Sequence, residues 1–213
     1  MTASNVPSHP GVDILSERRA WAGQYSNLDL VTFRHTRFDG VPSAERTWEL
    51  FRRGRAAALL PFDPWTDTVV LIEQFRLPAL AGGVAPVMVE IPAGLCDAGE
   101  DPVDTVRREL REETGVGCDR IETIGDFLLS PGGSDERCAM FAGRVHAPSV
   151  DADGLSGRFG LSSEDEDIRV RVWPADRAVA AAIAGEFPNS VTTIALLWLA
   201  ARRESLRAAW TVA

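Results

Sequence analysis

Apolar and polar residues alternate along two stretches near the start of the chain. Leu28 to His35 and Arg46 to Arg53 both alternate, and Phe38-Asp39-Gly40 between them supplies turn residues. This pattern predicts a β-hairpin. Two apolar runs follow, Ala56 to Phe62 and Thr68 to Phe75, and they predict a second pair of strands.

One segment has the periodicity of a helix. Val103, Val106 and Leu110 recur at helical spacing and form an apolar stripe. Asp101-Pro102 supplies an N-cap followed by a proline at the first helical position, and Gly115 supplies a C-terminal stop. We therefore expect a helix between Asp101 and Gly115.

The remaining segments complete a sheet with few helices. A polar, glycine-containing loop is expected from Ala147 to Asp167. We expect an α+β sandwich rather than a series of βαβ units. Further strands are predicted at Val87–Ile91, Ile121–Leu129, Cys138–His146 and Ile168–Trp173, and closing helices at Pro174–Ala184 and Ser190–Ser205.

Composition and charge limit the possible partners. The 213 residues include 45% hydrophobic and 25% charged residues, which is typical of a globular chain. A net charge of −9 argues against a nucleic-acid surface. The sequence contains no run of about 18 apolar residues, so we expect no membrane span. Met1 to Pro10 lacks the apolar core of a secretory signal. Three cysteines without CxxC spacing indicate reduced thiols in the cytoplasm rather than disulfides or a zinc site.

Three carboxylates lie together on the predicted helix. Glu109, Glu112 and Glu113 stand at i, i+3 and i+4, so they share one side of it. Such runs are often solvated faces with local ion pairs, and Arg107, Arg108 and Arg111 are close enough to pair with them. Three adjacent carboxylates also suit a hard cation such as Mg²⁺, which takes oxygen ligands and bridges to phosphate.

The spacing around these residues favours the cation. The run from Gly94 to Val116 resembles the Nudix box, Gly-x5-Glu-x7-Arg-Glu-U-x-Glu-Glu-x-Gly-U with U apolar, at every fixed position. This resemblance implies a Nudix αβα sandwich with a mixed sheet. It implies that Glu109 and Glu113 are the main metal ligands and that Glu112 assists. The backbone carbonyl of Ala93 resembles a further ligand. The structural residues of the box are Gly94, Glu100, Arg108 and Gly115, and Glu100 and Arg108 resemble a bracing ion pair.

Stretches outside the box resemble the ADP-ribose pyrophosphatase branch of that family. Arg76, at the end of Glu73-Gln74-Phe75-Arg76, is either a surface arginine or a phosphate ligand. The run from Ser130 to Glu136 has a proline and two glycines that suit a plain turn or a close approach to a ligand. Its Pro131 falls 16 residues after Gly115, a spacing that marks the branch. The resemblance implies substrate contacts by Ser130, Gly132 and Glu136.

The acidic run Ser163 to Asp167 is, taken alone, a solvated loop. It resembles the loop that carries the general base, with Glu164 as the base and Glu166 as a further metal ligand. Trp48 matches a tryptophan that stacks on adenine, although a half-buried sheet tryptophan is equally common. Tyr25 is a second aromatic candidate. The resemblance implies that residues 1–54 form a β-rich region for dimerisation that completes the partner's site, and that residues 55–213 form the Nudix domain.

The resulting prediction is hydrolysis of the pyrophosphate of ADP-ribose to AMP and ribose 5-phosphate. Two or three Mg²⁺ or Mn²⁺ ions per site would bind the pyrophosphate, and Glu164, with Glu112, would serve the catalytic step. The expected protein partner is a second copy of the chain, and the two copies would share their active sites. We expect no nucleic-acid partner and no membrane partner. Alternatives are another nucleoside diphosphate sugar, such as ADP-glucose or GDP-mannose, and a non-catalytic sensor of ADP-ribose.

Overall fold

The computed structural model describes residues 5–161 and 166–212. The chain forms two compact units. The smaller unit comprises Met1–Gly54 together with Leu128–Arg137, and the larger unit comprises Arg55–Phe127 together with Cys138–Ala213. In the described part of the chain, no helix is both long and apolar enough to cross a membrane.

The smaller unit contains a three-stranded antiparallel sheet in the order β1-β2-β3. Its strands are β1 (Val12–Ala22), β2 (Asn27–His35) and β3 (Arg46–Arg52). The predicted hairpin is confirmed as β2 and β3, whose register runs from Asn27 opposite Arg52 to Phe33 opposite Arg46. Strand β1 was not expected, because most of its side chains are exposed and its polar residues follow no simple alternation.

A buried aspartate organises the charged residues of this unit. Asp29 is only 1% exposed, and it accepts hydrogen bonds from Arg19 and, at 3.0 Å, from Arg52 Nε. The other nitrogens of Arg52 donate to Glu17 at 2.9 Å and to Asp135 at 3.0 Å. The hydrogen bond from Arg19 is the main reason that the pKa of Asp29 lies below its ordinary value. Arg52 thus ties all three strands to the segment 128–137.

The larger unit is built on an eight-stranded mixed sheet, whose central path is β10-β11-β5-β4-β9-β8. Strands β4 and β9 run parallel, because Arg137 bonds to Gly54 at one end and Val145 bonds to Phe62 at the other. Strands β6 and β7 pair with β5 and β4. The strands are β4 (Arg55–Asp63), β5 (Thr68–Phe75), β6 (Val87–Glu90), β7 (Ala93–Leu95), β8 (Arg120–Leu128), β9 (Arg137–Arg144), β10 (Leu155–Phe159) and β11 (Ile168–Pro174).

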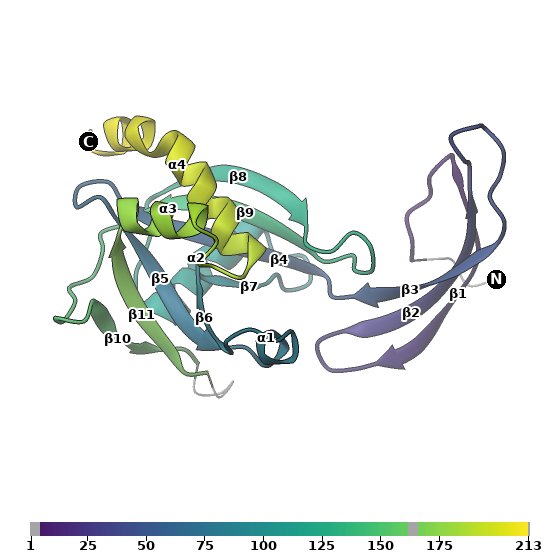
Figure 1. Ribbon diagram of the computed structural model, residues 1–213, viewed down its shortest axis with the longest axis horizontal. Helices are drawn as coiled ribbons and strands as arrows, with labels where there is room; N and C mark the ends of the chain where they lie inside the picture. Colours follow the sequence, from purple (N-terminus) through teal and green to yellow (C-terminus); the bar gives the residue numbers. More distant parts are fainter. Residues whose placement is uncertain (1–4, 162–165, 213) are drawn as a thin grey trace. The chain divides into compact units, whose positions relative to one another are not determined.

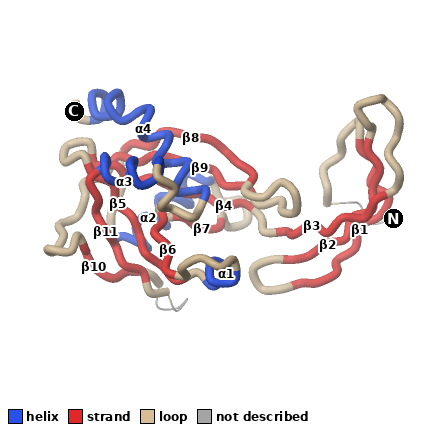
Figure 2. Tube along the Cα trace, in the orientation of Figure 1, coloured by secondary structure: helices blue, strands red, loops and turns tan. Residues whose placement is uncertain are grey.

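Helices cover both faces of this sheet, as Figure 1 and the tube in Figure 2 show. Helix α2 (Pro102–Thr114) packs on one face, where Val106 and Leu110 join a core with Ile72 and Val170. Helices α3 (Ala175–Ile183) and α4 (Ser190–Trp210) lie on the other face. A short helix, α1 (Leu77–Ala81), connects β5 to β6. The expected αβα sandwich is confirmed.

Two predictions of local structure were wrong in detail. The segment expected to be a loop from Ala147 to Asp167 contains β10, which pairs with β11 with a register shift between Leu155 and Gly157. The last helix does not end at Ser205 but continues to Trp210, because Leu206 and Trp210 are 2% and 5% exposed and extend its buried side.

Candidate active site

Helix α2 carries the three adjacent glutamates, and its ends are fixed as its sequence predicts. The side chain of Asp101 accepts a hydrogen bond from the Val103 amide at 2.8 Å, which caps the helix. Gly115 ends it in the left-handed region at φ 69°. Burial of Val106 and Leu110, 1% and 0% exposed, fixes the rotation of the helix against the sheet.

One arginine connects the acidic residues of the box. Arg108 donates from Nε and Nη2 to the two oxygens of Glu100, both at 3.2 Å. Its Nη1 donates to Glu109 at 2.7 Å and to Glu112 at 3.1 Å. The hydrogen bond from Arg108 is the main reason that the pKa of Glu100 falls to about 2. Arg108 therefore links the loop before α2 to two of the three predicted metal ligands.

Strand β7 lies directly against these carboxylates. The Ala93 amide donates to Glu113 Oε2 at 3.0 Å. A Cβ atom at Gly94 would lie 1.8 Å from Glu109 Oε1, far closer than any real contact. A residue without a side chain at position 94 is therefore necessary for Glu109 to occupy its place beside the backbone of β7.

Burial and mutual repulsion make the carboxylates costly to ionise. Glu113 is 2% exposed, and its burial raises its pKa well above the ordinary value, with a further increase from the charge of Glu109. Burial also raises the pKa of Glu109; the charges of Glu112 and Glu166 add to this effect, and Arg108 opposes it. A positive charge among these carboxylates would offset both the cost of burying their charges and the repulsion between them.

Glu166 belongs to the same neighbourhood. The segment before it is attached to α2 by a hydrogen bond from the Gly160 amide to the Glu112 carbonyl, 3.2 Å long. The Glu166 side chain accepts from the Leu161 amide at 3.1 Å. Its charge raises the pKa of both Glu109 and Glu113, as expected for nearby carboxylates. Glu164, the predicted general base, lies outside the described residues.

These residues fit a divalent cation in the type of donor that they offer. All the predicted ligands offer oxygen, which Mg²⁺ and Mn²⁺ prefer, and Gly94 leaves space for one of them. Within residues 5–161 and 166–212, no three His, Cys, Asp or Glu side chains form an assembled metal cluster as they lie. Arg108 and the Ala93 amide hold the carboxylates instead. Each of these carboxylates keeps further lone pairs with which it could bind a cation.

Arg76 lies at the end of β5. Its Nε donates to Glu90 Oε2 at 2.8 Å, and its side chain is 40% exposed. Its positive charge opposes the increase in the pKa of Glu113, so Arg76 affects one of the three clustered carboxylates of α2. Sequence reasoning missed Glu90. The available signal was a charged residue within the otherwise apolar strand Val87–Ile91.

Two of the predicted substrate residues line one cavity in the smaller unit. This cavity has a volume of about 190 Å³, and its walls include Trp48, Phe33 and Gly132. Trp48 is 54% exposed, and its ring contacts Phe33 edge-on, with ring centroids 5.1 Å apart. An exposed aromatic face beside glycine backbone suits a flat ring such as a purine.

The other predicted substrate residues of this unit do not line that cavity. Tyr25 is 67% exposed and its hydroxyl accepts from Gln24 at 3.0 Å. The Ser130 carbonyl closes the turn of its own segment by accepting from the Gly133 and Ser134 amides. Glu136 pairs with Arg53 at 3.4 Å.

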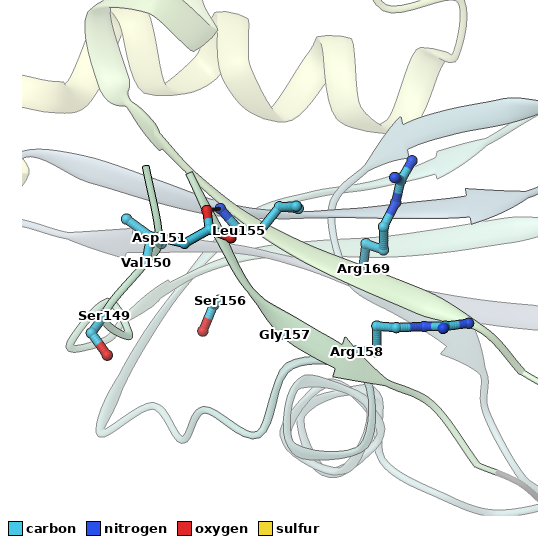
Figure 3. Close-up of a pocket in the computed structure, with 8 residues that line it drawn as sticks. All are labelled: Ser149, Val150, Asp151, Leu155, Ser156, Gly157, Arg158 and Arg169. Carbon is cyan, nitrogen blue, oxygen red and sulfur yellow. Dashed lines mark hydrogen bonds between the residues drawn. The ribbon is translucent and has the colours of Figure 1, made fainter. Parts of the chain in front are cut away.

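A larger cavity, of about 480 Å³, lies along β10 and β11 (Figure 3). Its two arginines are both paired: Arg158 with Asp167 at 2.6 Å and Arg169 with Glu73 at 2.8 Å. None of the predicted site residues lines it. The lining residues are Ser149, Val150, Asp151, Leu155, Ser156, Gly157, Arg158 and Arg169.

Comparison with known proteins identifies the class. The model of the NUDIX domain matches residues 52–191. The chain is 41% identical to an ADP-ribose pyrophosphatase of Escherichia coli K12 over 93% of this chain and 92% of that protein. It is 33% identical to an ADP-ribose pyrophosphatase of Haemophilus influenzae over 95% and 92%. This chain belongs to the Nudix family and is a Nudix hydrolase, and its predicted likeness to the ADP-ribose pyrophosphatase branch is confirmed.

Two further relatives extend this result. A GDP-mannose pyrophosphatase of Yersinia pestis is 34% identical over 74% of this chain and 77% of its own. A crystal structure of an ADP compounds hydrolase has a TM-score of 0.66 and 20% identity, and the match covers 97% of this chain and 100% of that one. The first relative shows that close likeness extends to enzymes named for another substrate, and the second confirms the fold.

Proposed function

We propose that this Nudix hydrolase cleaves the pyrophosphate of ADP-ribose to AMP and ribose 5-phosphate. The observation that carries the proposal is the cluster of three carboxylates, from Glu109, Glu112 and Glu113, beside Gly94. The helix that carries them matches the Nudix box at each of the fixed positions that lie on it. The choice of ADP-ribose is supported by likeness to two pyrophosphatases named for it, across more than nine tenths of the chain.

Magnesium ions fit the donors described above. Glu109, Glu112, Glu113, Glu166 and the carbonyl of Ala93 would hold two or three of them, with Mn²⁺ as a substitute. When bound, the ions neutralise the pyrophosphate and polarise the attacking water. The chain's own part is to hold the carboxylates together in a partly buried place, with Arg108 fixing Glu109 and Glu112.

The reaction adds one water across a P–O–P bridge. The water oxygen bonds to one phosphorus, the bridging bond of that phosphorus breaks, and the other phosphate leaves with the bridging oxygen. Glu164 accepts the proton of the water, and Glu112 supports the same catalytic step. Arg76 binds a phosphate through its guanidinium, and Trp48 stacks on the adenine with Gly132 beside it. Tyr25, Ser130 and Glu136 are proposed as further substrate contacts.

A second copy of the chain is the proposed partner. The sheet of the smaller unit exposes large apolar side chains, including Leu15, Trp21 and Trp48 at 45%, 55% and 54%. Trp21 pairs with position 28 of β2 and Trp48 with position 31, so the two aromatic side chains are exposed on opposite faces of this sheet, and each supports the proposal of a partner chain. We propose a homodimer with shared sites that acts in the cytoplasm, where the three free cysteines stay reduced. Light scattering with size-exclusion chromatography tests the dimer, and a monomer at micromolar concentration would contradict it.

The alternative substrate class is another nucleoside diphosphate sugar, favoured by the GDP-mannose pyrophosphatase relative. The test is kcat/KM for ADP-ribose, ADP-glucose, GDP-mannose and NADH, each with and without Mg²⁺. We expect Mg²⁺-dependent cleavage with the highest kcat/KM for ADP-ribose. A higher value for GDP-mannose would overturn the substrate, and binding of ADP-ribose without any cleavage would indicate a sensor.

A further inference from the structure

The pair between Arg76 and Glu90 is formed over an unusual distance along the sheet. In the pairing of β5 with β6, Glu90 lies opposite Ile72, four residues before Arg76. Four residues of strand span about 13 Å. The two side chains must therefore extend toward each other for Arg76 Nε to lie 2.8 Å from Glu90 Oε2. Glu90 thus sets the direction in which the Arg76 side chain lies.

The backbone is fixed at both ends of this pair. The Arg76 amide donates to the Pro86 carbonyl at 2.7 Å, and the Arg76 carbonyl accepts from the Ala79 amide at 3.1 Å. On both sides of Glu90, helix α4 holds strand β6. The Asn189 side chain donates to the Val89 carbonyl, and the Ile91 amide donates to the Thr192 hydroxyl, both at 3.1 Å.

The only large freedom left to Arg76 is therefore in its side-chain torsions. Arginine has many rotamers, and a partly exposed arginine at a strand end would sample them. Glu90 is only 17% exposed while Arg76 is 40% exposed, so the carboxylate is the inner, fixed member of the pair. Its bond restricts those torsions.

The bond to Glu90 occupies one nitrogen of the guanidinium. Among the described residues, no other group accepts a hydrogen bond from the Arg76 side chain. The two terminal nitrogens form the edge of the fork that matches two oxygens of a phosphate. The chain continues from Glu90 to Ala93, whose amide donates to Glu113 Oε2 at 3.0 Å, so the pair lies three residues along the chain from a backbone group that binds a carboxylate of α2.

We propose that Glu90 is a positioning residue for substrate binding: it holds Nε of Arg76 so that the terminal nitrogens face the diphosphate of the substrate. Glu90 itself does not touch the substrate, because a carboxylate would repel phosphate. The inference rests on the proposed function only in taking a nucleoside diphosphate as the substrate.

A double-mutant cycle tests this role. Arg76→Ala, Glu90→Ala and the double variant are compared with the wild type in two measurements: kcat and KM for ADP-ribose with Mg²⁺, and calorimetric affinity for ADP-ribose in EDTA, where no turnover occurs. Glu90→Ala should weaken affinity and raise KM by about tenfold, since one rotamer-rich side chain loses its order. When Arg76 is already alanine, Glu90→Ala should alter the affinity and the KM by less than twofold each.

Two controls separate positioning from general stability. Glu90→Gln keeps an oxygen that accepts from Nε, so it should retain affinity within about threefold of the wild type. Glu122→Ala removes a comparable pair, with Arg202 at 2.7 Å, between β8 and α4, and it should leave KM and affinity unchanged. Melting temperatures of all variants identify any that are poorly folded.

Three results would overturn the role of Glu90: an equal loss in both backgrounds, no loss in either background, or a loss by Glu90→Gln as large as that by Glu90→Ala. Failure of the proposed function is distinguished by the wild type alone, which would then fail to cleave ADP-ribose. In that case the affinities in EDTA, measured with ADP-ribose or with the substrate that the wild type does cleave, still decide the inference.

Discussion

Replacement of Gly94 by alanine tests whether the place of Glu109 matters to the reaction. The new Cβ atom would lie 1.8 Å from Glu109 Oε1 and 2.2 Å from its Cδ, whereas ordinary contact begins at 3.4 Å. The carboxylate must therefore move by about 1.6 Å. Misplacement of a reacting group by about 1 Å costs on the order of 100-fold in rate. We expect kcat/KM for ADP-ribose to fall at least that far.

The same change should affect stability little. The displaced atoms are the far end of a flexible side chain, and alanine lowers the entropy of the unfolded chain relative to glycine. We expect a loss of no more than about 1 kcal/mol, which corresponds to about 4 °C or less in the melting temperature. Calorimetry and steady-state kinetics on the same samples check both expectations.

Gly117 supplies a matched control for this variant. A Cβ atom there meets nothing within 4 Å, so Gly117→Ala should leave both activity and melting temperature near wild type. If Gly94→Ala retained kcat/KM within threefold of the wild type at saturating Mg²⁺, the place of Glu109 beside β7 would not matter. The argument for Gly94 would then be refuted.

Further predictions concern other charged residues. Glu113→Gln should abolish most turnover and leave the melting temperature unchanged or higher, because a neutral amide costs less to bury than the carboxylate, which is 2% exposed; turnover within threefold of wild type at saturating Mg²⁺ would contradict its role. Glu164→Gln should lower kcat far more than substrate affinity, and an unchanged kcat would assign the base to another acid. Asp29→Asn should lower the free energy of unfolding at pH 7 by about 2 kcal/mol in urea titrations. Because the pKa of Asp29 is depressed, the stabilisation that its carboxylate provides is complete above pH of about 4 and is lost as the pH falls through the folded-state pKa. The free energies of unfolding of the wild type and of Asp29→Asn should therefore converge in acid. Equal stability of the two at pH 7 would refute the role of Asp29.

The elements with strong local signals were predictable from the sequence. Helix α2 was located because its cap, its proline, its apolar stripe and its final glycine all agree, and each of them acts within a few residues. Strands β4 and β5 were located because each contains an apolar run that is buried, 57–62 in β4 and 69–72 in β5. In these segments, local pattern and tertiary burial point to the same structure.

The elements that depend on distant partners were missed. Strand β10 contains Ser156 and Gly157 and has little intrinsic preference for a strand; its pairing with β11 supplies the hydrogen bonds. Strand β1 is largely exposed and is defined by its long pairing with β2.

The same distinction applies to the site. The spacing of the box predicted that Glu109, Glu112 and Glu113 lie together, because a helix places them so. The pairing of Arg76 with Glu90 depends on side chains that reach along two strands, and no sequence period encodes that contact. The bond from the Gly160 amide to the Glu112 carbonyl brings the segment of Glu166 to α2, and it too follows only from the folded chain.

The most direct test of the account is the identity of the products formed from ADP-ribose. The purified protein is incubated with ADP-ribose in Mg²⁺ and in EDTA, and AMP and ribose 5-phosphate are quantified by chromatography and mass spectrometry. The account predicts equal amounts of both products in Mg²⁺, none in EDTA, and almost none from Glu113→Gln in Mg²⁺. Intact ADP-ribose after incubation of the wild type with Mg²⁺, or equal product from Glu113→Gln, would contradict it.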